Sequence, residues 1–354
     1  MLGLKRNEVK LVAHNPEWDT IAAQIIQQLW NIFDSNVEDI QHFGSTAIRH
    51  IKAKTYKEFK QKFDIATFEP LNKGWSADKK FIIETAEGEK RLLRIANIAE
   101  FDRKKAEYVM LERLYNLGIP TPKPIDFGLC NDGQSVYSVF SWIDGDDLEI
   151  HLPMLSEAEK YVMGLKVGEI LQKIHKTPAP DGAINWSEKY FSVIDERINA
   201  FRNAGILFDG SEVILEYLDV NRSLLINRKQ YFIHGDFHEG NLVVTPNNEL
   251  FVIDFLDEGF ENYADPWYDF KTFGENDNAY YSTGLIHGYF SGEPPDEFWE
   301  TLLYYYLTAA LTAIVWTKHH KPDELQQTLL WNEKNAKLIS ETHSPLMKWY
   351  LKNI

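Results

Sequence analysis

HGDFHEGN at residues 234–241 and FVID at residues 251–254 decide the fold of this chain. Between them, two short apolar runs lie on either side of TPNN at residues 245–248. Apolar, β-rich runs around a turn of this composition predict a β-hairpin. The hairpin would return Asp254 to the neighbourhood of Asn241.

Asp236 and Asn241 stand five residues apart, the same spacing as in the kinase catalytic loop H-R-D-x-x-x-x-N. Phosphoryl transfer needs positioning and charge neutralisation, and Mg²⁺ prefers hard oxygen ligands. Asn241 and Asp254 supply such oxygens, while Asp236 can orient an incoming hydroxyl and accept its proton. The alternative is that Asp236 and Asn241 only close a tight loop, with His234 and His238 capping backbone groups.

Over about residues 60–345 the chain resembles the aminoglycoside phosphotransferases and their choline-kinase-like relatives, whose motifs read H-G-D-x-H-x-x-N and I-D-F. The resemblance implies that Asp236 is the catalytic base and that Asn241 and Asp254 bind Mg²⁺. It also implies ATP as phosphoryl donor, with GTP possible. His234 and His238 would shape the loop, although both could also act as general acids or ligands.

DPWYDF at residues 265–270 is similar to the D-P-x-x-D-L segment of the same family. By that resemblance Asp269 supports the catalytic loop and takes no part in the chemistry.

Residues 62–143 resemble the small lobe of a kinase-like fold. Short runs at 68–71, 80–85 and 90–95 predict a β-meander, and residues 100–117 have helical spacing. Glu107 points to the apolar side of that helix, so it needs a cationic partner if buried. Arg94 is the candidate, and a guanidinium can bind carboxylate and phosphate alike. A structural ion pair is the alternative, with Glu100 and Glu112 as competing partners for Arg94.

The remaining nucleotide contacts are predicted from weaker signals. No G-x-G-x-x-G is present, and only Gly74 and Ser76 stand between the first two strands, where they could bind phosphates or form an ordinary turn. A strand over residues 137–143, with Phe140 and Trp142, would lead to a hinge whose backbone meets the adenine.

The first sixty residues resemble the start of the GrpB family, with FGST at residues 43–46. Members of that family look like nucleotidyltransferases with a K-P-x-x-D segment. This chain has KTYKE at residues 54–58, without the proline and with Glu58 in the Asp position. Because a second carboxylate for a metal pair is missing, we expect a truncated appendage without nucleotidyl transfer.

These observations predict an α+β chain with a bilobal, protein-kinase-like fold. We expect a truncated fragment over 1–60, a small antiparallel lobe that binds the nucleotide over 61–143, and a large, mainly helical lobe over 144–354. In the large lobe, SEAE at residues 156–159 is a capping box that opens a helix reaching about residue 176, with Gly164 and Gly168 as a close-packing edge. Aromatic-rich helices over 296–340 belong either to the core or to the acceptor pocket.

Composition indicates an enzyme of the cytoplasm. The chain has 354 residues and one cysteine, Cys130, which excludes an intramolecular disulfide and fits a reducing compartment. No apolar segment follows Met1 as in a secretory signal, and the run over 304–316 is shorter than the roughly 20 residues that span a bilayer. We therefore expect no membrane partner, and the sequence does not indicate an oligomeric state.

The net charge of -16 is concentrated near the candidate site. Residues 234–300 hold fifteen Asp and Glu against one basic residue, Lys271. Such a field attracts cations and repels nucleic acid, although an acidic surface can also serve solubility alone.

The sequence thus favours an ATP- and Mg²⁺-dependent phosphotransferase that acts on a hydroxyl of a small cationic molecule, such as an aminoglycoside-like compound or an amino alcohol. The alternative is a nucleotide-binding regulatory protein, a pseudokinase without turnover. The intact Asp236, Asn241 and Asp254 argue against that alternative. A protein kinase is disfavoured because no A-P-E segment follows Asp254.

Overall fold

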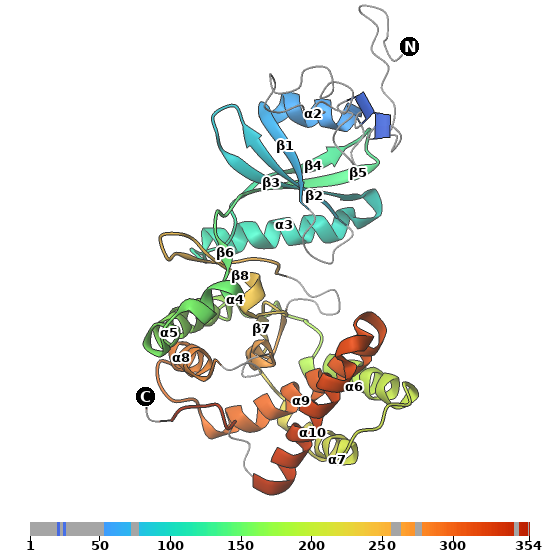
Figure 1. Ribbon diagram of the computed structural model, residues 1–354, viewed down its shortest axis with the longest axis vertical. Helices are drawn as coiled ribbons and strands as arrows, with labels where there is room; N and C mark the ends of the chain where they lie inside the picture. Colours follow the sequence, from blue (N-terminus) through green and yellow to red (C-terminus); the bar gives the residue numbers. More distant parts are fainter. Residues whose placement is uncertain are drawn as a thin grey trace, which may run out of the picture. The chain divides into compact units, whose positions relative to one another are not determined.

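The computed structural model describes residues 20–21, 24–25, 53–71, 78–255, 263–272, 278–342, 347–352 and 354. The chain forms two compact units and passes from the first to the second between Asp144 and Gly145. The first is built on an antiparallel sheet and the second is mainly helical, as expected for a kinase-like α+β fold (Figure 1).

The first unit contains a five-stranded sheet in the order β1-β2-β3-β5-β4, in which all neighbours pair antiparallel. The first three strands form the expected meander, and β5 then pairs with β3. Its elements are α2 (Ala53–Phe63), β1 (Ile65–Leu71), β2 (Lys79–Thr85), β3 (Lys90–Asn97), α3 (Phe101–Asn116), β4 (Pro124–Cys130) and β5 (Ser135–Ser141).

Alternation along β3 sends side chains to two helices on opposite faces of the sheet. Leu93 and Ile95 are buried in a cluster with Phe59 of α2. Arg94 points the other way, toward α3, where it contacts Glu107. Helix α2 runs across residue 60, the boundary expected between the N-terminal fragment and the lobe, and Phe59 is completely buried. The end of the GrpB-like segment is therefore part of the core of this unit.

Strand β4 was not expected from the sequence. It begins with Pro124 and contains Asp126 and Gly128, all of which are depleted in strands. The topology explains their presence, because β4 is the edge strand, where a proline at the first residue costs no ladder hydrogen bond.

The second unit carries the predicted capping box, since Ser156 accepts from the backbone N–H of Glu159 and Glu159 accepts from that of Ser156. Its helices are α4 (Leu148–His151), α5 (Glu157–Ile174), α6 (Trp186–Asn203), α7 (Ser211–Val220), α8 (Ala279–Phe290), α9 (Asp296–His320) and α10 (Leu325–Thr342). Its strands are β6 (Asp146–Asp147), β7 (Tyr231–Phe232), β8 (Leu242–Val244), β9 (Leu250–Val252) and β10 (Tyr263–Ala264).

Helix α9 is the aromatic-rich helix predicted as core or acceptor pocket. By length and composition it is the single candidate membrane span among the described residues, but 72% of its most apolar window is buried inside the protein. Tyr304 and Tyr305 are completely buried, and Tyr305 accepts a hydrogen bond from the Trp186 indole at 2.7 Å. These contacts place the middle of α9 in the core of the unit.

Helices α5 and α8 approach each other at glycines on both sides. A Cβ on Gly164 or Gly168 would lie 2.1 Å from a backbone oxygen of α8, and a Cβ on Gly284 or Gly288 would lie 2.2 and 2.1 Å from backbone oxygens of α5. No real Cβ fits such distances. The predicted close-packing edge of α5 therefore meets a matching edge on α8, a helix that we did not predict.

We expect Gly168→Ala to lower the free energy of unfolding by about 1–3 kcal/mol, because the added methyl group forces the two helices apart. The small gain in helix propensity does not offset this cost. Urea unfolding followed by circular dichroism measures it. Glu169→Ala, at an exposed position one residue further along α5, is the matched control and should change stability by less than about 0.5 kcal/mol. Equal stability of the two variants would contradict the packing.

Candidate active site

The loop over residues 234–241 is held by one buried carboxylate, that of Asp269. Its Oδ2 accepts the backbone N–H of His234 at 2.7 Å, and its Oδ1 accepts that of Gly235 at 2.7 Å. The side chain is completely buried. Burial raises the pKa of this carboxyl, but the hydrogen bond and charge of His175 together with the charges of His234 and Lys271 outweigh it and leave the pKa below its usual value. Asp269 therefore stays ionised and holds the backbone at the start of the loop.

Two further side chains hold backbone carbonyls of the loop. Lys271 Nζ donates to the carbonyl oxygen of Gly235, and Thr272 Oγ1 donates to that of Phe237 at 2.9 Å. Gly235 has a φ of 89°, a left-handed conformation that only glycine adopts readily. Sequence reasoning did not assign these contacts, although Lys271 could have been noticed as the one cation in an acidic stretch.

His175 links the loop to the α5–α8 packing. It follows the last residue of α5, and its Nε2 lies 3.0 Å from Asp269 Oδ2 while its Nδ1 lies 2.9 Å from the hydroxyl of Tyr289 on α8. This role could not be predicted from the sequence, because a single histidine after a helix has many possible partners. The close approach of the two helices thus positions the group that orients Asp269.

His234 joins the two parts of the predicted motif. Its Nδ1 accepts the backbone N–H of Asp236 at 3.2 Å, so Nδ1 is unprotonated. Its Nε2 must then carry the proton and donates to the carbonyl of Ile253 at 2.9 Å. Burial is the largest influence on this imidazole and lowers its pKa. A neutral His234 therefore ties Asp236 to the residue that precedes Asp254.

The carboxylate of Asp236 projects from this fixed backbone, with 53% of its side chain exposed. A contact to His238 is the main cause that lowers the pKa of Asp236, to about 2. The same contact, 3.5 Å between His238 Nε2 and Asp236 Oδ2, raises the pKa of His238. His238 Nδ1 also accepts the N–H of Gly240 at 3.0 Å. Both predicted loop histidines hold backbone donors.

Asn241 and Asp254 are brought together by the predicted hairpin. Leu242 pairs with Val252, and the carbonyl of Asn241 accepts the N–H of Ile253 at 3.0 Å, so Asp254 lies one residue beyond the partner of Asn241. The Asn241 side-chain nitrogen donates to the carbonyl of Asp236 at 2.8 Å, which makes its oxygen the available ligand atom. Asp254 is exposed and has a φ of 60°, a conformation that few residues other than glycine adopt.

This donor set fits a magnesium ion that is shared with a nucleotide. It offers one carboxylate and one amide oxygen, and Mg²⁺ commonly takes one or two protein ligands together with phosphate and water. In the described part of the chain no group of three or more His, Cys, Asp or Glu side chains could hold a metal ion by itself.

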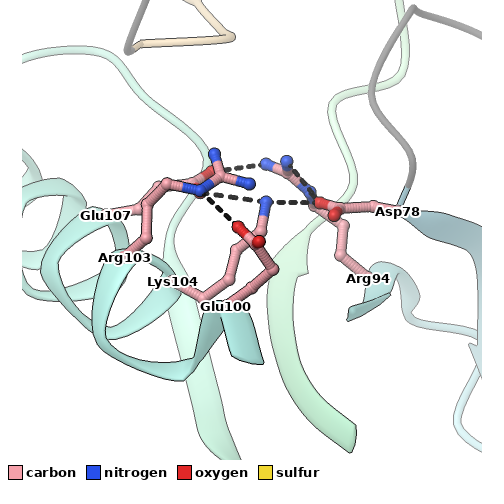
Figure 2. A network of polar contacts seen from close by, with 6 residues as sticks. All are labelled: Asp78, Arg94, Glu100, Arg103, Lys104 and Glu107. Atoms are coloured by element: carbon pink, nitrogen blue, oxygen red, sulfur yellow. Dashed lines mark hydrogen bonds and ion pairs between the residues drawn. The ribbon is translucent and has the colours of Figure 1, made fainter. Parts of the chain in front are cut away.

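The first unit contains the predicted pair of Arg94 and Glu107, whose Nη1 and Oε1 atoms are 2.5 Å apart (Figure 2). Glu100, a competitor for this contact, pairs with Arg103 at 2.7 Å instead. Two residues that were not predicted complete a cluster. Asp78 accepts from Arg94, and Lys104 lies between Asp78 and Glu107.

Four other residues were predicted to contact the nucleotide, and two of them are described in the structure. Gly74 and Ser76 lie outside the described residues. Phe140 is buried and its ring lies 5.8 Å from that of Tyr108 on α3. The backbone N–H of Trp142 donates to the carbonyl of Lys90 at 3.2 Å, which continues the sheet one residue past β5.

Comparison with known families places the chain. Residues 67–312 match the model of the phosphotransferase enzyme family. The chain belongs to this family. It is therefore a small-molecule kinase, as its sequence predicted. A second match covers residues 8–57 and is to GrpB protein, which confirms the resemblance of the N-terminal segment.

Solved structures of similar fold are aminoglycoside and fructosamine kinases. The ADP-bound aminoglycoside phosphotransferase APH(2'')-Ib is 18% identical, with a TM-score of 0.58 over 81% of this chain and 99% of that one. A GDP complex of aminoglycoside 2'-phosphotransferase-IIIa is 15% identical, with a TM-score of 0.59 over 80% of this chain and 97% of that one. A putative fructosamine-3-kinase from Haemophilus somnus is 16% identical, with a TM-score of 0.52 over 80% and 96% of the two chains. These likenesses confirm the kinase-like fold.

The N-terminal match has a curated relative, glutamate-rich protein GrpB of Alkalihalophilus pseudofirmus. It is 44% identical over 54 residues, which are 15% of this chain and 31% of the relative. The chain therefore spans about a third of the length of this relative.

The buried, neutral His234 predicts a loss of stability in acid. Its pKa is lowered in the folded state, so below the ordinary value of 6.5 the unfolded chain binds the extra proton and the free energy of unfolding decreases as pH falls. We expect His234→Gln to flatten the slope of unfolding free energy between about pH 6.5 and 5, by up to about 1.4 kcal/mol per pH unit.

Urea unfolding at several pH values measures this slope. His319→Gln, at an exposed position of α9, is the control, and its unfolding free energy should have the same slope with pH as that of the parent protein. If His234→Gln has the same slope as the parent, His234 is not held neutral and the tautomer assigned from its two hydrogen bonds is wrong.

Proposed function

We propose that the chain transfers the γ-phosphoryl group of ATP to a hydroxyl group of a small cationic molecule, with Asp236 as the base. The observation that supports this proposal is that the loop has a firmly held backbone but an exposed carboxylate. Its backbone is buried and held by Asp269, Lys271 and Thr272, while the carboxylate of Asp236 is half exposed. Rigid support beneath one exposed carboxylate is what a positioned base requires.

The chemistry of Asp236 follows from its low pKa. A carboxyl group with a pKa of about 2 is ionised at every physiological pH, but it is a weak base toward a free alcohol. Phosphoryl transfer passes through a loose transition state, in which the attacking hydroxyl loses its proton late. Asp236 therefore acts first by accepting a hydrogen bond that orients the hydroxyl, and then takes its proton as the bond to phosphorus forms.

Asn241 and Asp254 would hold Mg²⁺ through the amide oxygen and the carboxylate. When bound, the metal neutralises charge on the nucleotide phosphates. The protein contributes the positions of these two oxygens through the β8–β9 pairing and through the hydrogen bond from the Asn241 amide to Asp236. A change at either end of the hairpin should therefore affect both metal binding and the base.

The phosphoryl donor is supported by the fold and by the first unit. The similar structures include ADP and GDP complexes, which supports a nucleotide as the donor; we propose ATP and leave GTP as the second donor to test. We assign Arg94 to the nucleotide phosphates and Glu107 to its orientation. Gly74 and Ser76 remain proposed phosphate contacts, and the strand end at Phe140 and Trp142 remains the proposed adenine contact.

A cationic acceptor is supported by charge. The stretch 234–300 has fifteen acidic residues and one basic residue, and the fold is shared with kinases whose complexes contain gentamicin and kanamycin. An aminoglycoside-like compound or an amino alcohol suits such a field. The same field disfavours nucleic acid as a partner.

We place the protein in the cytoplasm, where its substrate ATP is abundant and its buried Cys130 stays reduced. The N-terminal segment would then be a truncated fragment without nucleotidyl transfer, because it corresponds to only a third of a GrpB protein and has Glu58 in place of the expected Asp, while its end in α2 packs into the core of the first unit.

The test is an assay of ADP release with Mg-ATP and Mg-GTP over a panel of hydroxylated amines and sugars, with mass spectrometry of the acceptor. We expect Asp236→Asn to lower kcat on the order of 10³-fold, because the hydroxyl loses its acceptor while the fold is kept. Removal of Mg²⁺ with a chelator should abolish turnover.

Glu249→Gln is the matched control, since it neutralises an exposed carboxylate in the turn between β8 and β9 and should leave kcat unchanged. Should the wild-type chain bind ATP while no acceptor raises ADP release above the level of Asp236→Asn, the chain is a nucleotide-binding protein without turnover.

A further inference from the structure

Four charged side chains of the first unit form a cluster in which each carboxylate contacts both cations (Figure 2). Its members, Asp78, Arg94, Lys104 and Glu107, are all largely buried, and Arg94 is the most exposed with 13% of its side chain accessible. The four formal charges sum to zero. A neutral cluster is a poor receptor for nucleotide phosphates, so the assignment of Arg94 to phosphate binding requires an explanation.

The two carboxylates contact the cations in different ways. Glu107 bridges them, with Oε1 at 2.5 Å from Arg94 Nη1 and Oε2 at 3.3 Å from Lys104 Nζ. Asp78 directs all of its cluster contacts through one atom. Its Oδ2 accepts from Arg94 Nε at 3.0 Å, from Arg94 Nη2 at 2.7 Å and from Lys104 Nζ at 2.5 Å.

Three charged donors that converge on one oxygen are the surroundings that a phosphate oxygen also takes. The hollow beside this oxygen, lined by Asp78, Arg94, Lys104 and Ser138 among the described residues, has no room for a water molecule. Because Asp78 Oδ2 takes these three donors, a phosphate oxygen that binds the same donors has to replace the Asp78 carboxylate. Without that carboxylate, Arg94 and Lys104 balance against Glu107 with a net charge of +1, which attracts an anion.

We propose that Arg94 and Lys104 together bind a phosphate oxygen of the nucleotide at the position that Asp78 Oδ2 fills here, so that Asp78 competes with the nucleotide. Lys104 is then a second phosphate-binding cation, and Glu107 keeps the two cations in place. Asp78 limits nucleotide affinity. This inference rests on the proposed function, since it assigns the phosphate contacts of the same nucleotide.

The pKa of Asp78 agrees with this assignment. Burial raises it, but the charges of Arg94 and Lys104 outweigh burial and lower it, so the group is an anion when it occupies the position. Lys104 and Glu107 are one helical turn apart on α3 and hold their spacing independently of Asp78.

The test is isothermal titration of the full chain with ADP, adenosine and pyrophosphate, in the absence of Mg²⁺ so that Asp254 takes no part. We expect Asp78→Asn to lower the Kd of ADP and pyrophosphate on the order of tenfold, because a competing charge is removed while the shape is kept. Lys104→Gln should raise both values by a similar factor. Neither variant should change the Kd of adenosine.

Lys105→Gln is the matched control, because this exposed residue follows Lys104 on α3 and its ammonium group lies over the Phe101 ring. It should leave the Kd of ADP unchanged. An Asp78→Asn protein that binds ADP with unchanged or weaker affinity overturns the inference and makes Asp78 a structural partner of Arg94.

If circular dichroism shows that Asp78→Asn does not fold, Lys104→Gln decides the matter through the ratio of the ADP and adenosine Kd values. A rise in this ratio supports the inference, and an unchanged ratio overturns it. Failure of the wild-type chain to bind ADP would contradict the proposed function itself. ADP binding by the wild type without the expected change in the variants contradicts only the role of Asp78 and Lys104.

Discussion

The structure of the second unit depends on the buried, ionised carboxylate of Asp269. A buried charge is tolerated only when it is paired and hydrogen-bonded, and Asp269 satisfies this requirement with two backbone N–H groups of the loop and with His175. The loop in turn depends on Asp269. The loop cannot move away without leaving the charge unpaired, so the energetic cost of burying Asp269 is also what holds Asp236 in place.

This constraint reaches far along the chain. His175 is positioned by the end of α5 and by the hydroxyl of Tyr289, and α5 and α8 can approach only because glycines face each other. Within the loop, His234 donates a hydrogen bond to the carbonyl of Ile253 and so helps to position the next residue, Asp254. In the first unit the buried charges are neutralised differently, because two cations and two carboxylates pair with one another through side chains and not through backbone N–H groups. There, Arg94 and Lys104 are held by ion pairs with Asp78 and Glu107, and we propose that a phosphate oxygen can take the place of Asp78.

The sequence predicted the parts of this architecture that local chemistry determines. The hairpin after Asn241, the capping box at Ser156 and the contact between Arg94 and Glu107 follow from spacing, turn composition and the need to pair a buried charge. Partners that only the folded chain brings together could not be predicted in this way. Helix α8 was not predicted, because Gly284 and Gly288 lower its helix propensity and their packing against α5 exists only in the folded chain. Asp78 and Lys104 were missed because nothing in their local sequence shows that they share an oxygen.

Asp269 is expected to act on catalysis through the position of Asp236. A double-mutant cycle on the kcat of phosphoryl transfer tests it most directly, with Asp236→Asn, Asp269→Asn and the double variant, each confirmed as folded by circular dichroism. We expect that Asp269→Asn alone is strongly impaired and that the double variant is no slower than Asp236→Asn alone. If the two losses multiply in the double variant, the residues act independently and Asp269 does not act through Asp236.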